Sequence, residues 1–249
     1  MRPYLSVIIP CYKEEERIKK TFPAFDRFAR IQKYPVELIF IDDGSPDKTR
    51  EVIEELIAGK PYCRLIYYKQ NKGKGYGVMR GMLEARGEYR LFADADNATS
   101  IEQANKLLKY AEDYPVVIGS RYLAGFHQKR KQSFVRILGS RALNVGARLF
   151  TGLKITDSQC GFKLFADYVV EEIFKRQTFT RFSFDIEILA IADMLGYKIK
   201  EVPIDWYDDP HSTVHPIRDG FRFLWALILI VWNKWRRIYK SKDHRLLKV

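Results

Sequence analysis

The fold is decided at Leu91-Phe92-Ala93-Asp94-Ala95-Asp96-Asn97-Ala98-Thr99, where an apolar run ends abruptly in two carboxylates. The run from Tyr89 to Ala93 predicts a buried strand. Side chains alternate along an extended segment, so Asp94 and Asp96 are expected to point the same way. Convergent carboxylates repel each other unless a cation lies between them, and Mg²⁺ or Mn²⁺ accepts oxygen ligands that it shares with phosphate. The pair predicts a metal–diphosphate site, with an Asx-rich turn as the alternative.

Further strands are predicted at residues 5–9, 36–41, 63–68 and 116–118. Helical patterns separate the strands of the first half, which is typical of βαβ units and an α/β fold with a mostly parallel sheet. Ligands of open α/β sheets bind outside the carboxyl ends of the strands. We therefore expect one shared site from the polar clusters that end three strands, namely Tyr12 with Glu14, Asp42 with Asp43, and Asp94 with Asp96.

The glycine pattern limits the kind of nucleotide that this site could bind. The first strand-to-helix turn lacks Gly-x-Gly-x-x-Gly, and the glycine-rich residues 71–77 do not close with Gly-Lys-Ser/Thr. A dinucleotide Rossmann site and a Walker loop are therefore disfavoured. Acidic residues at a nucleotide site suit a base N–H, ribose hydroxyls and a metal-bound diphosphate, and a nucleotide-sugar combines all three.

Four motifs carry a family resemblance. They are, in order, Pro10-Cys11-Tyr12-Lys13-Glu14, Ile41-Asp42-Asp43-Gly44-Ser45, Asn71-Lys72-Gly73-Lys74-Gly75 and Ala93-Asp94-Ala95-Asp96. Together they resemble the GT-A glycosyltransferases of family 2. Gly119-Ser120-Arg121 and the segment Asp157-Ser158-Gln159-Cys160-Gly161-Phe162-Lys163-Leu164-Phe165 extend the match over roughly residues 4 to 220. The second of these most resembles dolichyl-phosphate glucose synthases and, less closely, the mannose synthases.

The resemblance implies roles and domains. It implies a GT-A domain over residues 1–215, with a nucleotide-sugar half at about 1–120 and an acceptor half at about 121–215. Asp94 and Asp96 would hold Mg²⁺ or Mn²⁺, and Arg121 would face the donor or acceptor phosphate. The nucleotide-sugar, UDP-glucose by this resemblance, would contact Pro10, Tyr12, Glu14, Asp42, Asp43, Lys74 and Ala95.

The net charge of +12 is unevenly distributed, because residues 114–156 contain eight Lys or Arg and no Asp or Glu. Such a block suggests a membrane surface, a phosphate or a nucleic acid, or else a solvated basic face. A helix is predicted at 133–151, where Arg136 and Ser140 lie one turn apart and could both donate to a phosphate. In the resembling family this region receives the lipid phosphate, and Arg218 is a further candidate.

An acid near the acceptor is implied by position within Phe182-Ser183-Phe184-Asp185-Ile186-Glu187. A soluble sugar acceptor requires a base that deprotonates its hydroxyl. A polyprenyl phosphate already carries an ionised oxygen, so Asp185 or Glu187 could order the sugar or a loop instead. Both interpretations stay open at this point.

Residues 216–249 are predicted to form a C-terminal helix and a basic tail. The helix is apolar from Phe223 to Trp232 and then basic, and it contains three of the four tryptophans. Tryptophan at an apolar–basic boundary suits a lipid headgroup zone, and a buried or homo-oligomer-forming helix explains the same pattern. Its apolar run is shorter than the roughly 20 residues of a spanning helix.

The sequence therefore predicts a peripheral enzyme on the cytoplasmic side of a membrane, the endoplasmic reticulum of a eukaryote or the plasma membrane of a prokaryote. By the resemblance, it would transfer glucose from UDP-glucose to a dolichyl-type polyprenyl phosphate with inversion. GDP-mannose or a soluble acceptor is the alternative. A nucleic-acid-binding protein is disfavoured, because it leaves the acidic strand ends without a role.

Overall fold

The computed structural model describes residues 2–123, 146, 151–207 and 216–240. The first half alternates strands and helices as predicted. Its elements are β1 (Leu5–Cys11), α1 (Glu15–Ile31), β2 (Val36–Asp42), α2 (Thr49–Ile57), β3 (Cys63–Tyr67), α3 (Lys74–Glu84), β4 (Tyr89–Ala93), η1 (Ile101–Gln103), α4 (Ala104–Leu108) and β5 (Val116–Ser120). The second half contains β6 (Phe162–Ala166), α6 (Asp167–Phe174), α7 (Phe184–Met194), β7 (Ile199–Pro203), α8 (Pro216–Trp235) and η2 (Ile238–Lys240).

The seven strands form one sheet in the order β3-β2-β1-β4-β6-β5-β7. β1 pairs in parallel with both β2 and β4, with Cys11 opposite Asp42 and Ile8 opposite Phe92. β6 runs antiparallel to its neighbours β4 and β5, and β7 is again parallel to β5. The sheet is therefore mostly parallel, as predicted, and its one reversed strand is a feature that the sequence interpretation did not name.

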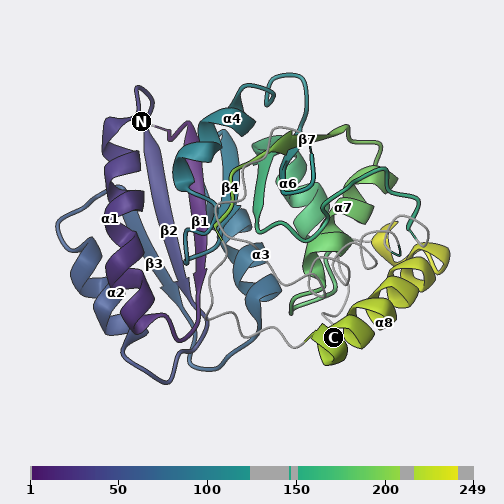
Figure 1. The fold of residues 1–249 in the computed structure, drawn as a ribbon, viewed down its shortest axis with the longest axis horizontal. Coiled ribbons are helices and arrows are strands. Elements are labelled where there is room, and N and C mark those ends of the chain that lie inside the picture. Colours follow the sequence, from purple (N-terminus) through teal and green to yellow (C-terminus); the bar gives the residue numbers. More distant parts are fainter. Residues whose placement is uncertain (1, 124–145, 147–150, 208–215, 241–249) are drawn as a thin grey trace.

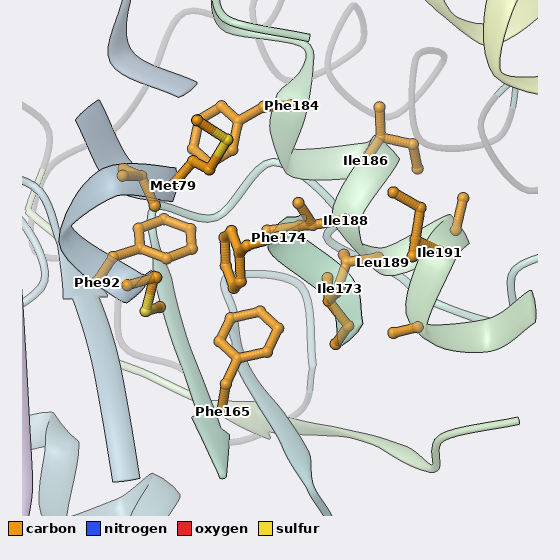
Figure 2. Packing of buried hydrophobic residues seen from close by; sticks show 14 of the residues in the cluster. Met79, Phe92, Phe165, Ile173, Phe174, Phe184, Ile186, Ile188, Leu189 and Ile191 are labelled. Atoms are coloured by element: carbon orange, nitrogen blue, oxygen red, sulfur yellow. The ribbon is translucent and has the colours of Figure 1, made fainter. Parts of the chain in front are cut away.

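Helices cover both faces of the sheet because successive strand residues point to opposite faces. On one face, Val7 and Ile9 pack with Phe22 and Phe25 of α1. The opposite cluster contains Ile8 together with residues of α3, α6 and α7. Figure 2 shows rings of this second cluster meeting between sheet and helices, Phe92 of β4 with Phe184 of α7 and Phe165 of β6 with Phe174 of α6.

The last helix, α8, lies at the opposite end of the molecule from α1 and α2 (Figure 1). One of its faces belongs to the α3–α6–α7 cluster, through Phe223, Ala226, Leu227 and Ile230. No described helix is long and apolar enough to cross a membrane. The proposed boundary at residue 216 stays a prediction, although this face of α8 shares the core of the preceding domain.

Candidate active site

The three predicted polar clusters meet at one edge of the sheet. Because β1 lies between β2 and β4, the carboxyl ends of the three strands are adjacent. The Asp43 amide donates to the Cys11 carbonyl over 3.0 Å just beyond the paired residues. Burial raises the pKa of Glu14, and the charges of Asp96 and Asp94 raise it further. This strand order confirms that the three distant motifs lie side by side, and their forming one binding site stays a prediction.

The Asp94–Asp96 segment is a turn, so the prediction of an extended segment is wrong. The Asn97 amide donates to the Asp94 carbonyl over 3.2 Å, and the Ala98 amide donates to the Asp96 carboxylate over 2.9 Å. These local bonds turn the chain, as short polar side chains commonly do. The two carboxylates still influence each other, because the pKa of Asp96 is raised by burial and then by Asp94.

Lys74 meets the Asp pair at the first residue of α3. Its ammonium lies 2.5 Å from an oxygen of Asp94. Burial lowers the pKa of Lys74, but Asp94, Asp185 and Asp96 outweigh that effect and raise it. Gly73, which precedes Lys74, has φ of +102° and packs against the Thr180 carbonyl. Only glycine fits this approach, so the Asn71–Gly75 motif positions a cation beside the acidic pair.

Asp43 holds the loop that carries Lys74. Its carboxylate accepts hydrogen bonds from the Lys72 amide over 2.7 Å, the Gly73 amide over 2.7 Å and the Asn71 side chain over 2.9 Å. Asp42, at the end of β2, accepts from the Ser45 amide over 3.2 Å. The structure therefore gives Asp43 a supporting contact, and its nucleotide contact stays a prediction.

Asp185 lies in the first turn of α7 with a buried lysine as its partner. The Lys163 ammonium is fully buried and lies 2.5 Å from an Asp185 oxygen and 2.5 Å from the Cys160 carbonyl. Burial raises the pKa of Asp185, while Lys163 and Lys74 lower it. The site thus contains two neighbouring ion pairs, and the role of Asp185 toward the sugar or a loop stays a prediction.

Glu187 does not share this surrounding. It is fully buried, and both of its oxygens accept hydrogen bonds from the protein. Of the two acids that the sequence left open, Asp185 is therefore the one near Lys74 and Asp94.

Arg121 is bound by the fully buried carboxylate of Asp157. Its Nε and Nη2 atoms donate over 2.8 and 2.9 Å, and its amide donates over 3.0 Å. Although burial opposes ionisation, the guanidinium holds the pKa of Asp157 below its ordinary value. Glu201 of β7 accepts from the amides of Thr156 and Asp157. This network fixes Arg121 at the end of β5, and its phosphate contact stays a prediction.

The other predicted contacts lie at the same edge or outside the described residues. Tyr12 is 42% exposed just after β1, and Ala95 is buried within the turn. Pro10 belongs to β1, opposite Ile41. Arg136 and Ser140 lie outside the described residues, and Arg218 lies in α8 where its side chain is not described.

Sequence reasoning missed the supporting residues Lys163, Asp157 and Gln177. Lys163 and Asp157 belong to a motif that was quoted, and a lysine inside an apolar strand is itself a signal that a buried acid pairs with it. Gln177 donates to the carbonyls of Gly75 and Phe179, and it belongs to none of the sequence motifs named above.

Comparison with known proteins identifies the family. The family model described as "Glycosyl transferase family 2" matches residues 6–174, well over half of the chain. The chain belongs to glycosyl transferase family 2. This glycosyltransferase is 34% identical over 253 aligned positions to the dolichyl-phosphate beta-glucosyltransferase of Dictyostelium discoideum, an alignment that covers 96% of this chain and 77% of the relative.

Other relatives have the same name. The human dolichyl-phosphate beta-glucosyltransferase is 30% identical, with 93% of this chain and 77% of the relative covered. The transferase ALG5A of Trichomonas vaginalis is 35% identical, with 82% of this chain covered. The glycosyltransferase described here thus spans about three quarters of the first two relatives and 65% of the third.

Solved structures show the same GT-A fold. The glucosyl-3-phosphoglycerate synthase of Mycobacterium tuberculosis, crystallised with Mn²⁺, UDP and its product, matches with a TM-score of 0.66 at 18% identity. That match covers 93% of this transferase and 80% of the synthase. The mannosyl-3-phosphoglycerate synthase of Rubrobacter xylanophilus matches with a TM-score of 0.69 at 16% identity, covering 99% and 78%.

Proposed function

We propose that this transferase moves glucose from UDP-glucose to a dolichyl-type polyprenyl phosphate with inversion. The observation that carries the proposal is the acidic pair Asp94 and Asp96 beside Lys74 at the carboxyl ends of the strands. The names of the relatives support glucose and the lipid acceptor. UDP in the structural neighbour supports the donor base.

The acidic residues at this edge fit a divalent cation. Asp96 and Glu14 are each destabilised as anions by burial and by neighbouring carboxylates, which a cation would relieve. Among the described residues no group of three or more Asp, Glu, His or Cys side chains converges as metal ligands. Asp94 and Asp96 would hold the ion, and diphosphate and water would supply its remaining ligands. The bound ion would stabilise negative charge on the departing UDP.

Two lysines would have different duties. In the structure Lys74 neutralises Asp94. When a cation shares that carboxylate, the Lys74 ammonium becomes available to donate to the donor diphosphate. Lys163 favours the ionised form of Asp185 and fixes its position, so that Asp185 would accept a hydrogen bond from a sugar hydroxyl.

The proposed transfer requires no protein side chain to act as a base. A phosphate oxygen of the acceptor forms the new bond to the anomeric carbon, while the bond from that carbon to the UDP oxygen breaks on the opposite side. The acceptor oxygen is already ionised at neutral pH, so no proton has to be removed. Arg121 and the basic segment after it would attract and orient the acceptor phosphate.

A membrane surface is the proposed location, on the cytoplasmic side. The outer face of α8 exposes a continuous apolar stripe at helical spacing. This stripe consists of Leu224, Trp225, Ile228, Val231, Trp232 and Trp235. Basic residues follow at Lys234, Arg236, Arg237 and Lys240, which suits the anionic headgroups of a leaflet. A second copy of the chain is the competing occupant of this face.

A transfer assay tests the proposal. Purified protein is given Mn²⁺ or Mg²⁺, a short prenyl phosphate and a panel of radiolabelled nucleotide-sugars that includes GDP-mannose. We expect label in the lipid fraction from UDP-glucose. Asp96→Asn should lower kcat/KM roughly a hundredfold, because a metal's charge stabilisation is worth several kcal/mol.

The exposed Asp113 provides the matched control, since Asp113→Asn removes the same charge before the amino end of β5, away from the carboxyl ends of the strands, and should leave transfer unchanged. If only GDP-mannose gave labelled lipid, the donor would be GDP-mannose and not UDP-glucose. If label appeared in a soluble sugar acceptor and Asp185→Asn were inactive, the acceptor would be that sugar and not the lipid phosphate. No transfer from any donor would defeat the proposal.

A further inference from the structure

Glu187 joins α7 both to the segment just before it and to residues near position 239, which are distant in sequence. From α7, its carboxylate accepts hydrogen bonds from the Thr178 amide over 3.0 Å, the Phe179 amide over 2.8 Å and the Tyr239 hydroxyl over 3.0 Å. The Thr178 hydroxyl also donates to it. Asn233 of α8 donates to the hydroxyls of Tyr239 and Thr178 over 3.4 and 3.5 Å. Burial of this network is nearly complete, so every bond in it is protected from water.

The segment 177–181, which Glu187 holds, contacts the first turn of α3. The Tyr76 amide donates to the Thr180 carbonyl over 3.1 Å, and the Gln177 side chain donates to the Gly75 carbonyl over 2.9 Å. A Cβ on Gly75 would lie 2.9 Å from the carbonyls of Phe179 and Arg181, so the two segments are in close contact. Lys74 is the first residue of this turn, so a displacement of segment 177–181 is expected to move it.

The two acids of α7 therefore have different surroundings. Asp185 faces Lys163 and Lys74 in the site, and Glu187, two residues later, faces segment 177–181 and the C-terminal residues. Residues two apart on a helix point in nearly opposite directions.

We infer that Glu187 is a positioning residue, which aligns segment 177–181 with Tyr239 of the C-terminal segment and so fixes Lys74 at the donor diphosphate. Its carboxylate does not touch the substrates. Because α8 carries the exposed apolar stripe on its other face, the same network links the placement of that helix to the donor site. The inference rests on the proposed function only for the identity of the donor.

Removing one oxygen atom tests this link. Tyr239→Phe deletes the bond from Tyr239 to Glu187, together with the long bond that Asn233 donates to the Tyr239 hydroxyl, and leaves the Thr178 and Phe179 bonds to Glu187 in place. The control is Tyr62→Phe, because the Tyr62 hydroxyl donates to a carboxylate of Asp26 over 2.7 Å at the opposite end of the strands. Both variants lose one tyrosine–carboxylate bond.

Hydrogen exchange of the full chain is measured first, without any ligand. In Tyr239→Phe we expect roughly tenfold faster exchange at the amides of Thr178, Phe179 and Tyr76, since a buried hydrogen bond to Glu187 is lost. Binding of UDP with Mn²⁺ should weaken by a similar factor, with kcat changed less than the donor KM. Tyr62→Phe should change neither measurement.

Glu187→Gln extends the series by removing an acceptor from the same amides, and it should produce a larger effect of the same kind. Wild-type exchange at all three amides in Tyr239→Phe would overturn the inference, as would unchanged UDP affinity despite faster exchange. If the wild-type protein does not bind UDP at all, the proposed function fails, and the exchange measurement still decides whether Glu187 aligns these segments.

Discussion

Gly161 confines the carboxylate of Asp94. A Cβ at this position would lie 2.7 Å from the Asp94 Cγ atom and 2.9 Å from its Oδ1 atom. Asp94 is already held by Lys74 on another side. The acid therefore has little room to rotate, and the orientation of a proposed metal ligand depends on the absence of one methyl group.

Gly161→Ala should accordingly lower glucosyl transfer and Mn²⁺ affinity by at least about tenfold while the chain stays folded, because ligand orientation sets metal affinity. Activity, Mn²⁺ titration and thermal unfolding check this. Gly77→Ala is the matched control. Gly77 lies within α3, and a Cβ there would lie 3.4 Å from a side-chain carbon of Ile41, an ordinary van der Waals distance. Equal activity of the two variants would contradict the role given to Asp94.

Glu187 should also make stability depend on pH. Burial raises its pKa from 4.5 to about 7, against the opposing effect of its hydrogen-bond donors. A raised carboxyl pKa contributes stability that is fully present below about pH 4.5 and is lost as the pH rises through about 7. The loss is on the order of 3 kcal/mol for a shift of this size. Tyr239, whose pKa burial raises, stays neutral throughout.

Urea unfolding of wild type and Glu187→Gln from pH 5 to pH 8 isolates this contribution. The free energy of unfolding of wild type should fall relative to the variant as the pH rises, because glutamine does not titrate. Other acids with raised pKa values, such as Asp96, contribute equally to both proteins and cancel. Parallel curves would show that Glu187 is ionised at every pH tested.

Among the elements, α8 presents two apolar faces with different partners. Leu227 and Ile230 lie on the face that packs into the protein core, whereas Trp225, Trp232 and Trp235 are 57%, 50% and 72% exposed. Substitution on the two faces should therefore have separate consequences.

Trp232→Ser should weaken binding to anionic vesicles and leave the melting temperature unchanged, because an exposed ring contributes little to folding. Leu227→Ala should instead destabilise the chain by about 2–5 kcal/mol, as loss of a buried leucine does. Vesicle co-sedimentation and thermal unfolding measure the two effects. If Trp232→Ser sedimented with vesicles as the wild type does, but was a monomer where the wild type is a dimer, the outer face of α8 would be the contact with a second copy of the chain.

The strands of the first half were predictable from sequence because each is an apolar run that ends in a polar cluster. β6 was not, because Phe162–Ala166 contains Lys163, and the acid that neutralises this lysine lies 22 positions later in the chain. The extended Asp94–Asp96 segment was predicted wrongly, because the hydrogen bonds that the amides of Asn97 and Ala98 donate to these two aspartates turn the chain, as the alternative prediction had it. Sequence patterns reveal the local periodicity of strands and helices, whereas an ion pair between residues far apart in the chain can be recognised only once the fold is known.

For the whole molecule, the α/β class and the shared edge of three motifs followed from strand alternation. The closeness of Asp185 to Lys74, and the contact between Glu187 and Tyr239, did not follow, because each depends on how helices pack across the sheet. The contacts expected of Arg136 and Ser140 lie outside the described residues.

The reversal of β6 has a consequence for how such a chain can diversify. β5 and β6 are antiparallel, with Ile118 opposite Lys163, so the chain leaves the sheet after Ser120 and re-enters it at Phe162 along the same border. The bonds between Arg121 and Asp157 close the base of this excursion. An insertion, deletion or exchange between these two residues leaves the order of strand pairing untouched. A descendant enzyme could acquire a new acceptor in this region and inherit its donor chemistry unaltered.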